Sequence, residues 1–249
     1  MSESRNAAIA AAAAWFDAGA LLADLRRRVG IRTESQSPER AADLARYLTE
    51  EIGPAVERLG FRQTFWDNPV AGAPPMLFAE RSEDPSLPTV LIYGHGDVVA
   101  GHDSQWTGGR SPWDVVEAGD RWYGRGTADN KGQHTINLAA LGQVLAARGR
   151  LGFNAKLLLE MGEEVGSPGL RRTCAARAEV LRADVLIASD GPRLRSDRPT
   201  LFLGSRGAFN FDLAVDLREG AHHSGNWGGL LMNPGVVLAS AIASMIDAR

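Results

Sequence analysis

The chain has 249 residues and a formal net charge of −3, and 44% of its residues are hydrophobic while 23% are charged. This balance is typical of a globular protein of one large domain, or of one domain and part of another, and it lacks the basic excess usual in nucleic-acid-binding proteins. Cys174 is the only cysteine, so an internal disulfide and a cysteine-rich zinc site are both excluded, and any metal would need His, Asp and Glu ligands.

Residues 6 to 29 are predicted to form one helix. The segment opens with an alanine-rich run, and apolar residues then recur at helical spacing up to Val29, which Gly30 follows. The apolar run at 7–14 has charged residues before it and is too short to cross a membrane, which takes about 20 residues. We therefore expect no membrane partner and a cytoplasmic protein.

Short apolar runs alternate with helical segments through the next 160 or so residues, which is typical of an α/β fold. Helices are predicted at 38–51, after the glycine-rich segment 122–132, and at 168–182. Strands are predicted at 61–65, 76–80, 89–94, 155–161 and 185–188. This order predicts a mostly parallel sheet flanked by helices, in which ligands bind beyond the carboxyl ends of the strands.

Three of the predicted strands lead directly into residues that can bind a metal ion. His95 and Asp97 follow the strand at 89–94, and their spacing of two places both side chains on one side of an extended chain. Glu163 and Glu164 follow the strand at 155–161, and Asp190 follows the last strand. A hydrogen-bonded histidine, a solvated acidic turn or an aspartate turn would each explain one of these sites. Their recurrence at strand ends favours one shared site.

Three tryptophans lie close together between the strand at 89–94 and the glycine-rich segment: Trp106, Trp113 and Trp122. One interpretation is that they pack a long loop onto the core. The alternative is that they form the wall of a substrate cleft. The sequence leaves both interpretations open.

The pattern changes after Pro199. Residues 200–203 and 208–217 are predicted to be strands, since apolar residues alternate with polar or small ones along the second. An amphipathic helix is predicted to begin at Asn233-Pro234. We therefore predict a first domain over residues 1–204 and the beginning of a second, α+β domain over 205–249.

Five segments, in order along the chain, resemble the motifs of the M20 metallopeptidases, a family that includes dipeptidases, glutamate carboxypeptidases and aminoacylases. They are Gly94-His-Gly-Asp-Val-Val99, Gly124-Arg-Gly-Thr-Ala-Asp-Asn-Lys-Gly132, Gly162-Glu-Glu-Val-Gly-Ser167, Ala188-Ser-Asp190 and Ala221-His-His-Ser-Gly-Asn-Trp-Gly-Gly229. The last segment points to the dipeptidase branch. The resemblance implies a zinc-exopeptidase-like catalytic domain, followed by the start of a ferredoxin-like lid or dimerisation domain.

The resemblance also implies two zinc ions per subunit, with Co²⁺ or Mn²⁺ as alternatives. His95 and Asp190 would bind one ion, Glu164 would bind the other, and Asp129 would bridge the two. The peptide bond between Asp129 and Asn130 would be cis, as is typical in this family.

Three further residues receive roles from the resemblance. Asp97 would orient the His95 imidazole, and Glu163 would act as the general base. His223 would reach from the lid of one subunit of a homodimer into the other active site and stabilise the developing oxyanion, although the neighbouring His222 fits the same motif. His102, His134 and His222 have no evident partner and are otherwise expected to be structural or surface residues.

The function implied is hydrolysis of the amide bond of a dipeptide or short peptide, by water that two zinc ions activate and a glutamate deprotonates. One alternative is an aminoacylase or N-acyl-amino-acid deacylase that uses the same site on an N-acyl amino acid. Family members are longer, and a last histidine ligand and a substrate-binding arginine have no counterpart here. A second alternative is therefore an inactive, truncated fragment that acts only as a dimerising module.

Overall fold

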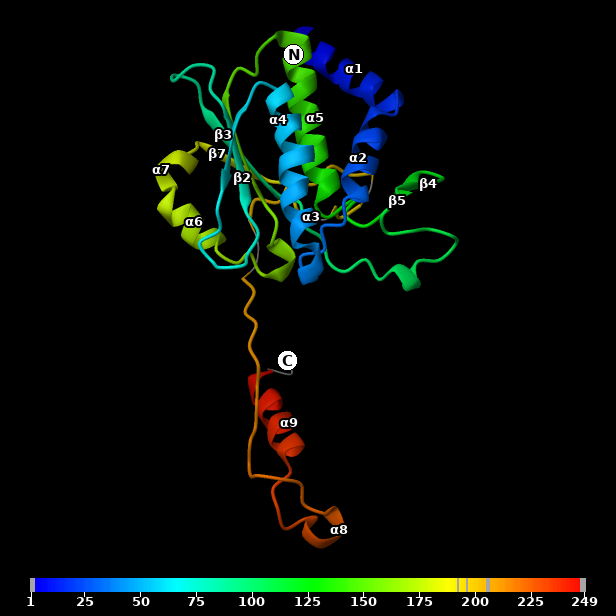
Figure 1. The fold of residues 1–249 in the computed structure, drawn as a ribbon, viewed down its shortest axis with the longest axis vertical. Coiled ribbons are helices and arrows are strands. Elements are labelled where there is room, and N and C mark those ends of the chain that lie inside the picture. The colour runs from blue at the N-terminus through cyan, green and yellow to red at the C-terminus, as the bar shows by residue number, and fades with distance from the viewer. Residues whose placement is uncertain (1–2, 192, 196, 205–206, 247–249) are drawn as a thin grey trace. The chain divides into compact units, whose positions relative to one another are not determined.

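The computed structural model describes residues 3–191, 193–195, 197–204 and 207–246. They fall into two units, Met1–Leu194 and Arg195–Arg249, each of which is described by itself. The first unit is built around a five-stranded sheet with the strand order β1-β2-β6-β3-β7. Helices α3, α4 and α5 cover one face of this sheet, and α6 and α7 cover the other (Figure 1).

Four of the five strands run in the same direction. β2 is antiparallel to both of its neighbours, β1 and β6, whereas β6, β3 and β7 are mutually parallel. The strands are β1 (Arg62–Trp66), β2 (Met76–Arg81), β3 (Thr89–His95), β6 (Asn154–Glu160) and β7 (Val185–Ala188). The predicted α/β fold with a mostly parallel sheet is thus confirmed, and the carboxyl ends of β6, β3 and β7 lie along one edge.

The first predicted helix is in fact two helices, α1 (Glu3–Asp17) and α2 (Ala20–Gly30). Gly19 separates them with a φ of 75°, and a left-handed residue ends a right-handed helix. Within the described residues, no single helix is long and apolar enough to cross a membrane. α1 and α2 are long and apolar enough for a membrane span only when they are taken together, and the two helices are bent by 61° relative to each other.

The second predicted helix extends beyond its expected end. A 3₁₀ turn, α3 (Ala41–Arg46), a π-helical segment (Tyr47–Ile52) and α4 (Gly53–Arg58) follow one another without a loop. Pro54 has no N–H to bond to the carbonyl four residues earlier, and the wider π-helical turn ends two residues before it, at Ile52. The result is a long helical stretch whose π-helical segment begins at the buried Tyr47.

Three other features refine the predicted elements. α5 (Lys131–Arg148) forms as expected and ends at Gly149, whose φ is 69°. The helix expected at 168–182 is divided into α6 (Leu170–Ala176) and α7 (Ala178–Leu181). A small hairpin that the sequence did not indicate joins β4 (Val116–Ala118) to β5 (Arg121–Tyr123).

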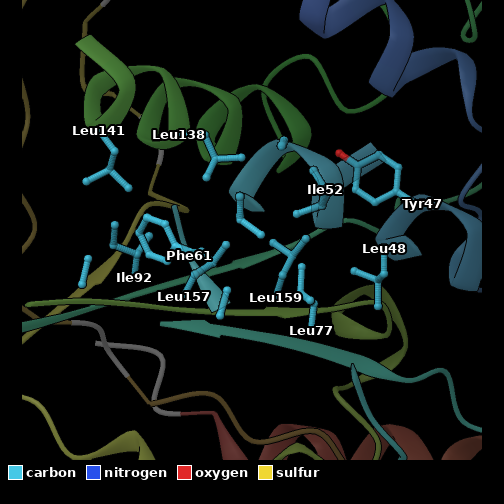
Figure 2. Close-up of a cluster of buried hydrophobic side chains, with 14 of the residues drawn as sticks. Tyr47, Leu48, Ile52, Phe61, Leu77, Ile92, Leu138, Leu141, Leu157 and Leu159 are labelled. Carbon is cyan, nitrogen blue, oxygen red and sulfur yellow. The ribbon is translucent and has the colours of Figure 1, made fainter. Parts of the chain in front are cut away.

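The core lies on both faces of the sheet because strand side chains alternate. Leu157 and Leu159 point to the face that α3, α4 and α5 cover, where they join the buried cluster formed with these helices (Figure 2). Leu158 points to the opposite face and packs in a second cluster with Trp66 and Phe78. Cys174 of α6 lies against this second cluster, partly buried, and is a free thiol.

The second unit contains α8 (Ser224–Trp227) and α9 (Pro234–Met245). α9 begins where predicted, and the side chain of Asn233 caps it by accepting a hydrogen bond from the N–H of Gly235. The strands predicted at 200–203 and 208–217 are wrong for the residues that the structure describes, since none of them belongs to a strand. Alternating side chains form a strand only where another strand provides backbone hydrogen bonds. No ferredoxin-like arrangement is seen in the part of this unit that the structure describes.

Truncation of Leu159 should destabilise the first unit strongly. Its side chain is fully buried between β6 and the helices, so Leu159→Ala should lower the free energy of unfolding by about 2–5 kcal/mol. Ile136→Ala on α5 is the matched control, because Ile136 is 55% exposed and its loss should change stability by less than about 0.5 kcal/mol. Urea denaturation followed by circular dichroism measures both, and equal losses would contradict this account of the core.

Candidate metal centre

His95 lies at the centre of a cluster of carboxylates at the carboxyl edge of the sheet. It is the last residue of β3, and its side chain is fully buried. Its Nε2 atom lies 3.0 Å from Oδ1 of Asp129, 3.5 Å from Oδ2 of Asp190 and 3.9 Å from Oε2 of Glu163. One ligand atom each from His95, Asp129 and Asp190 lie within 4.8 Å of one another. These three could therefore hold a metal ion together.

The contacts of Nδ1, the other ring nitrogen of His95, determine which ring nitrogen carries the hydrogen when the ring is neutral. Nδ1 lies 3.2 Å from Oδ1 of Asp97 and 3.1 Å from the Asp97 carbonyl oxygen. The carbonyl oxygen can only accept a hydrogen bond, so Nδ1 carries a hydrogen and donates it. The lone pair of Nε2 then points at negative oxygens, an arrangement that needs a proton or a metal ion between them. Neutral imidazole and carboxylate are the ligands that zinc accepts when cysteine is absent.

The charges in the cluster perturb its pKa values in a consistent way. Burial alone would lower the pKa of His95, but hydrogen bonds with Asp190 and Asp97 and their negative charges raise it to about 11. Burial and the neighbouring carboxylates raise the pKa values of Asp129, Glu163 and Glu164. The cluster thus holds more negative charge than one imidazolium neutralises, and a divalent cation would stabilise it.

Asp97 does more than orient the imidazole. Its fully buried carboxylate accepts hydrogen bonds from the backbone N–H groups of Glu163 and Glu164, at 3.1 Å each. These two residues begin a 3₁₀ turn, Glu163–Val165, that follows β6. One carboxylate therefore fixes both the ring of His95 and the turn that carries the two glutamates.

Asn130 is a site residue that the sequence analysis missed. The peptide bond between Asp129 and Asn130 is cis, as predicted. The buried side chain of Asn130 accepts from the N–H of His95 at 3.3 Å, and its Nδ2 donates to Oδ1 of Asp190 at 2.9 Å and to the carbonyl of Ser189 at 2.8 Å. Asn130 thus joins the ends of β3 and β7, and its position next to Asp129 was the only sequence signal.

The remaining predicted site residues do not belong to the group of His95, Asp129 and Asp190. Glu164 is not part of the three-residue group, although burial and the charge of Asp129 raise its pKa. His223 belongs to the second unit, where it is exposed and its Nδ1 accepts a hydrogen bond from Gly225. His102 and His222 are exposed, whereas His134 is buried and hydrogen-bonded.

The three tryptophans are held by different contacts, which are compatible with either interpretation. Trp106 donates to the carbonyl of Gly101, and Trp113 lies under the guanidinium of Arg32. Trp122 stacks on Phe16 of α1 with ring centroids 5.6 Å apart.

The structure is thus an α/β fold with a group of residues at the carboxyl edge of its parallel strands that could hold a metal ion. Residues 91–226 match the model of peptidase family M20/M25/M40. This match covers more than half of the chain and includes all the residues of the cluster, so the chain belongs to this family.

Known relatives agree with this assignment. The chain is 34% identical over 208 residues to the Beta-Ala-His dipeptidase of Mus musculus, a match that covers 82% of this chain and 42% of that protein. It is 37% identical over 162 residues to the cysteinylglycine-S-conjugate dipeptidase of Corynebacterium striatum, covering 64% and 35%. The matched region is thus less than half the length of either relative.

The fold is also that of a solved family structure. The structure of the di-peptidase Dug1p from Saccharomyces cerevisiae superimposes with a TM-score of 0.75 at 21% identity, over 100% of this chain and 54% of that chain. At this identity the likeness shows the shared fold.

Zinc binding should release a proton at neutral pH. His95 has a pKa of about 11, so its ring is protonated well above pH 7, and Nε2 must lose this proton to bind zinc. The apparent zinc affinity should therefore rise with pH up to that value, by up to about tenfold per unit. Calorimetric titration at pH 7 in two buffers of different ionisation enthalpy measures the protons released. Zinc binding without proton release would contradict this protonation state.

Asp97→Asn should weaken zinc binding by about 10- to 100-fold, as losses of groups that orient metal ligands do. The Asp97 carboxylate has two acceptor oxygens, which face His95 and accept hydrogen bonds from Glu163 and Glu164, whereas the amide has only one. Asp120→Asn is the control, since the Asp120 side chain is 96% exposed. Competition with a chromophoric chelator measures both affinities, and equal affinities would show that Asp97 does not organise the site.

Proposed function

We propose that this chain carries the metal centre of a metallodipeptidase, which hydrolyses the amide bond of dipeptides or short peptides. The observation that supports this most directly is the convergence of His95, Asp129 and Asp190 beside Glu163. Membership of the M20/M25/M40 family and the dipeptidases among its relatives support the substrate class.

The donor set suits two zinc ions. In the proposal, His95 and Asp190 would hold one ion, Glu164 would hold the other, and Asp129 would contribute to both. Zinc, when bound, lowers the pKa of a water molecule toward neutrality and polarises the substrate carbonyl. Asp97 and Asn130 hold these ligands through the hydrogen bonds described above, so that they need little rearrangement when the ions bind.

Glu163 is the proposed general base. Its carboxylate is 39% exposed and lies at the border of the cluster, where it can meet both a water molecule and a substrate. Burial and nearby carboxylates raise the pKa of Glu163. This brings the pKa closer to neutral pH, where a general base is most effective if its pKa lies near the pH of the reaction. Glu163 would take a proton from the attacking water and transfer it to the leaving amine.

His223 is proposed to complete the site across a homodimer formed through the second domain. A neutral or protonated imidazole placed beside the substrate carbonyl would stabilise the negative charge that develops on its oxygen. His223 lies in an exposed segment before α8, so its side chain is accessible for such a role.

Glu163→Gln should lower turnover strongly while keeping zinc. The amide cannot accept the proton, and loss of a general base lowers kcat by about 10²- to 10⁴-fold. Hydrolysis of β-Ala-His and Cys-Gly by the zinc-loaded chain measures activity, and metal analysis measures occupancy. Retained turnover would exclude Glu163 as the base.

The same assay separates the alternatives. An N-acyl-amino-acid deacylase would cleave N-acetyl amino acids in preference to the dipeptides. A dimerising fragment without catalytic function would bind no zinc and cleave neither substrate class. Two zinc ions per chain together with dipeptide hydrolysis would exclude both.

A further inference from the structure

We propose that Tyr47, His134 and Asn130 form a buried hydrogen-bond relay that positions His95 and Asp190, two of the proposed metal ligands. This inference rests on the proposed metal site and assigns roles to Tyr47 and His134, which lie outside the residues that would contact a metal or substrate. The three residues come from the π-helical segment, from α5 and from the loop before it.

The relay is continuous and buried. The Tyr47 hydroxyl lies 2.6 Å from Nε2 of His134, and Nδ1 of His134 lies 3.3 Å from Oδ1 of Asn130. Each of the three side chains is at most 1% exposed. Asn130 and His134 are four residues apart and so lie on one side of the start of α5. The relay then reaches Asp190 through the Nδ2 of Asn130.

Its neighbours fix the orientation of the Asn130 amide. Oδ1 faces the N–H of His95, which can only donate, and Nδ2 faces the carbonyl of Ser189 and the carboxylate of Asp190, which accept. Nδ1 of His134 therefore faces an acceptor oxygen and must carry the ring hydrogen. Nε2 is left as the acceptor for the hydroxyl of Tyr47.

The electrostatic environment keeps both titratable residues of the relay, His134 and Tyr47, in the protonation states that the relay requires. Burial, together with the positive charges of Arg28 and Lys131, lowers the pKa of His134 well below its ordinary value, so the ring is neutral. Burial raises the pKa of Tyr47, so its hydroxyl keeps the proton that it donates. Hydrogen bonds thus run in one direction, from Tyr47 through His134 and Asn130 to Asp190.

Two glycines of the His95 motif make room for the relay. A Cβ at Gly96 would lie 2.6 Å from the Tyr47 ring, and a Cβ at Gly94 would lie 2.9 Å from Oδ1 of Asn130. Both distances are shorter than van der Waals contact allows. The absence of side chains on either side of His95 therefore lets the relay approach the ligand closely.

The first experiment determines the tautomer of His134 in the unmodified chain. A long-range ¹H–¹⁵N correlation spectrum of protein with ¹⁵N-labelled histidine distinguishes the neutral Nδ1–H ring from the Nε2–H ring and from the protonated ring. The His134 signals are those missing from the spectrum of His134→Asn. We expect the Nδ1–H tautomer, and either of the other two forms would overturn the relay.

The second experiment measures zinc affinity by chelator competition. Tyr47→Phe removes only the hydroxyl, and His134→Leu removes both ring nitrogens, so each should weaken zinc binding by about tenfold or more. His134→Asn should lose less, because its amide nitrogen can donate to Asn130 in place of Nδ1. Tyr123→Phe on β5 is the matched control and should leave the affinity unchanged.

The outcomes separate positioning from simple packing. Unchanged zinc affinity in folded Tyr47→Phe and His134→Leu would overturn the relay, even if both variants melt at lower temperatures. If neither variant folds, the tautomer decides the question. A wild-type chain that binds no zinc would instead contradict the proposed metal centre, and the tautomer would still test the relay.

Discussion

The structure of the site depends on one constraint: the buried ring of His95 must be held with its Nε2 atom toward several carboxylates. Asp97 satisfies this constraint because it accepts the hydrogen of Nδ1 while its carboxylate also binds the backbone of the turn that carries Glu163. Asn130 contributes as well, because it accepts a hydrogen bond from the N–H of His95 and donates one to the carboxylate of Asp190. The position of each ligand is therefore fixed by a hydrogen bond to another part of the site.

The sheet makes this arrangement possible. Because β6, β3 and β7 are parallel neighbours, the residues that follow each of them emerge at the same edge. The hydrophobic clusters on the two faces of the sheet hold the strands in register, with Leu157 and Leu159 on one face and Leu158 on the other. Residues that are distant in sequence and could bind a metal ion are thus brought together by the packing of apolar side chains on the sheet.

Several features were predictable from residue order and type. The apolar strands followed from short apolar runs, α5 from helical spacing, and His95, Glu163 and Asp190 from their recurrence at strand ends. Asp129 was placed in the site only by the resemblance to the M20 motifs. Other features were not, because they depend on backbone geometry or on distant partners. Gly19 broke a helix that propensity favoured, the π-helical segment extended another to Arg58, and residues 208–217 alternate without a partner strand among the described residues.

His134 illustrates the difference between the two sources of information. The sequence by itself determined which residues could bind a metal, since side-chain chemistry and strand-end position are local properties. It left His134 without a partner, because Tyr47 is 87 residues away and reaches it only through the packing of α5 on the helical stretch that begins at α3. Only the tertiary structure decided which hydrogen bonds orient the ligands, for hydrogen bonds depend on distances of a few tenths of an ångström that no residue pattern specifies.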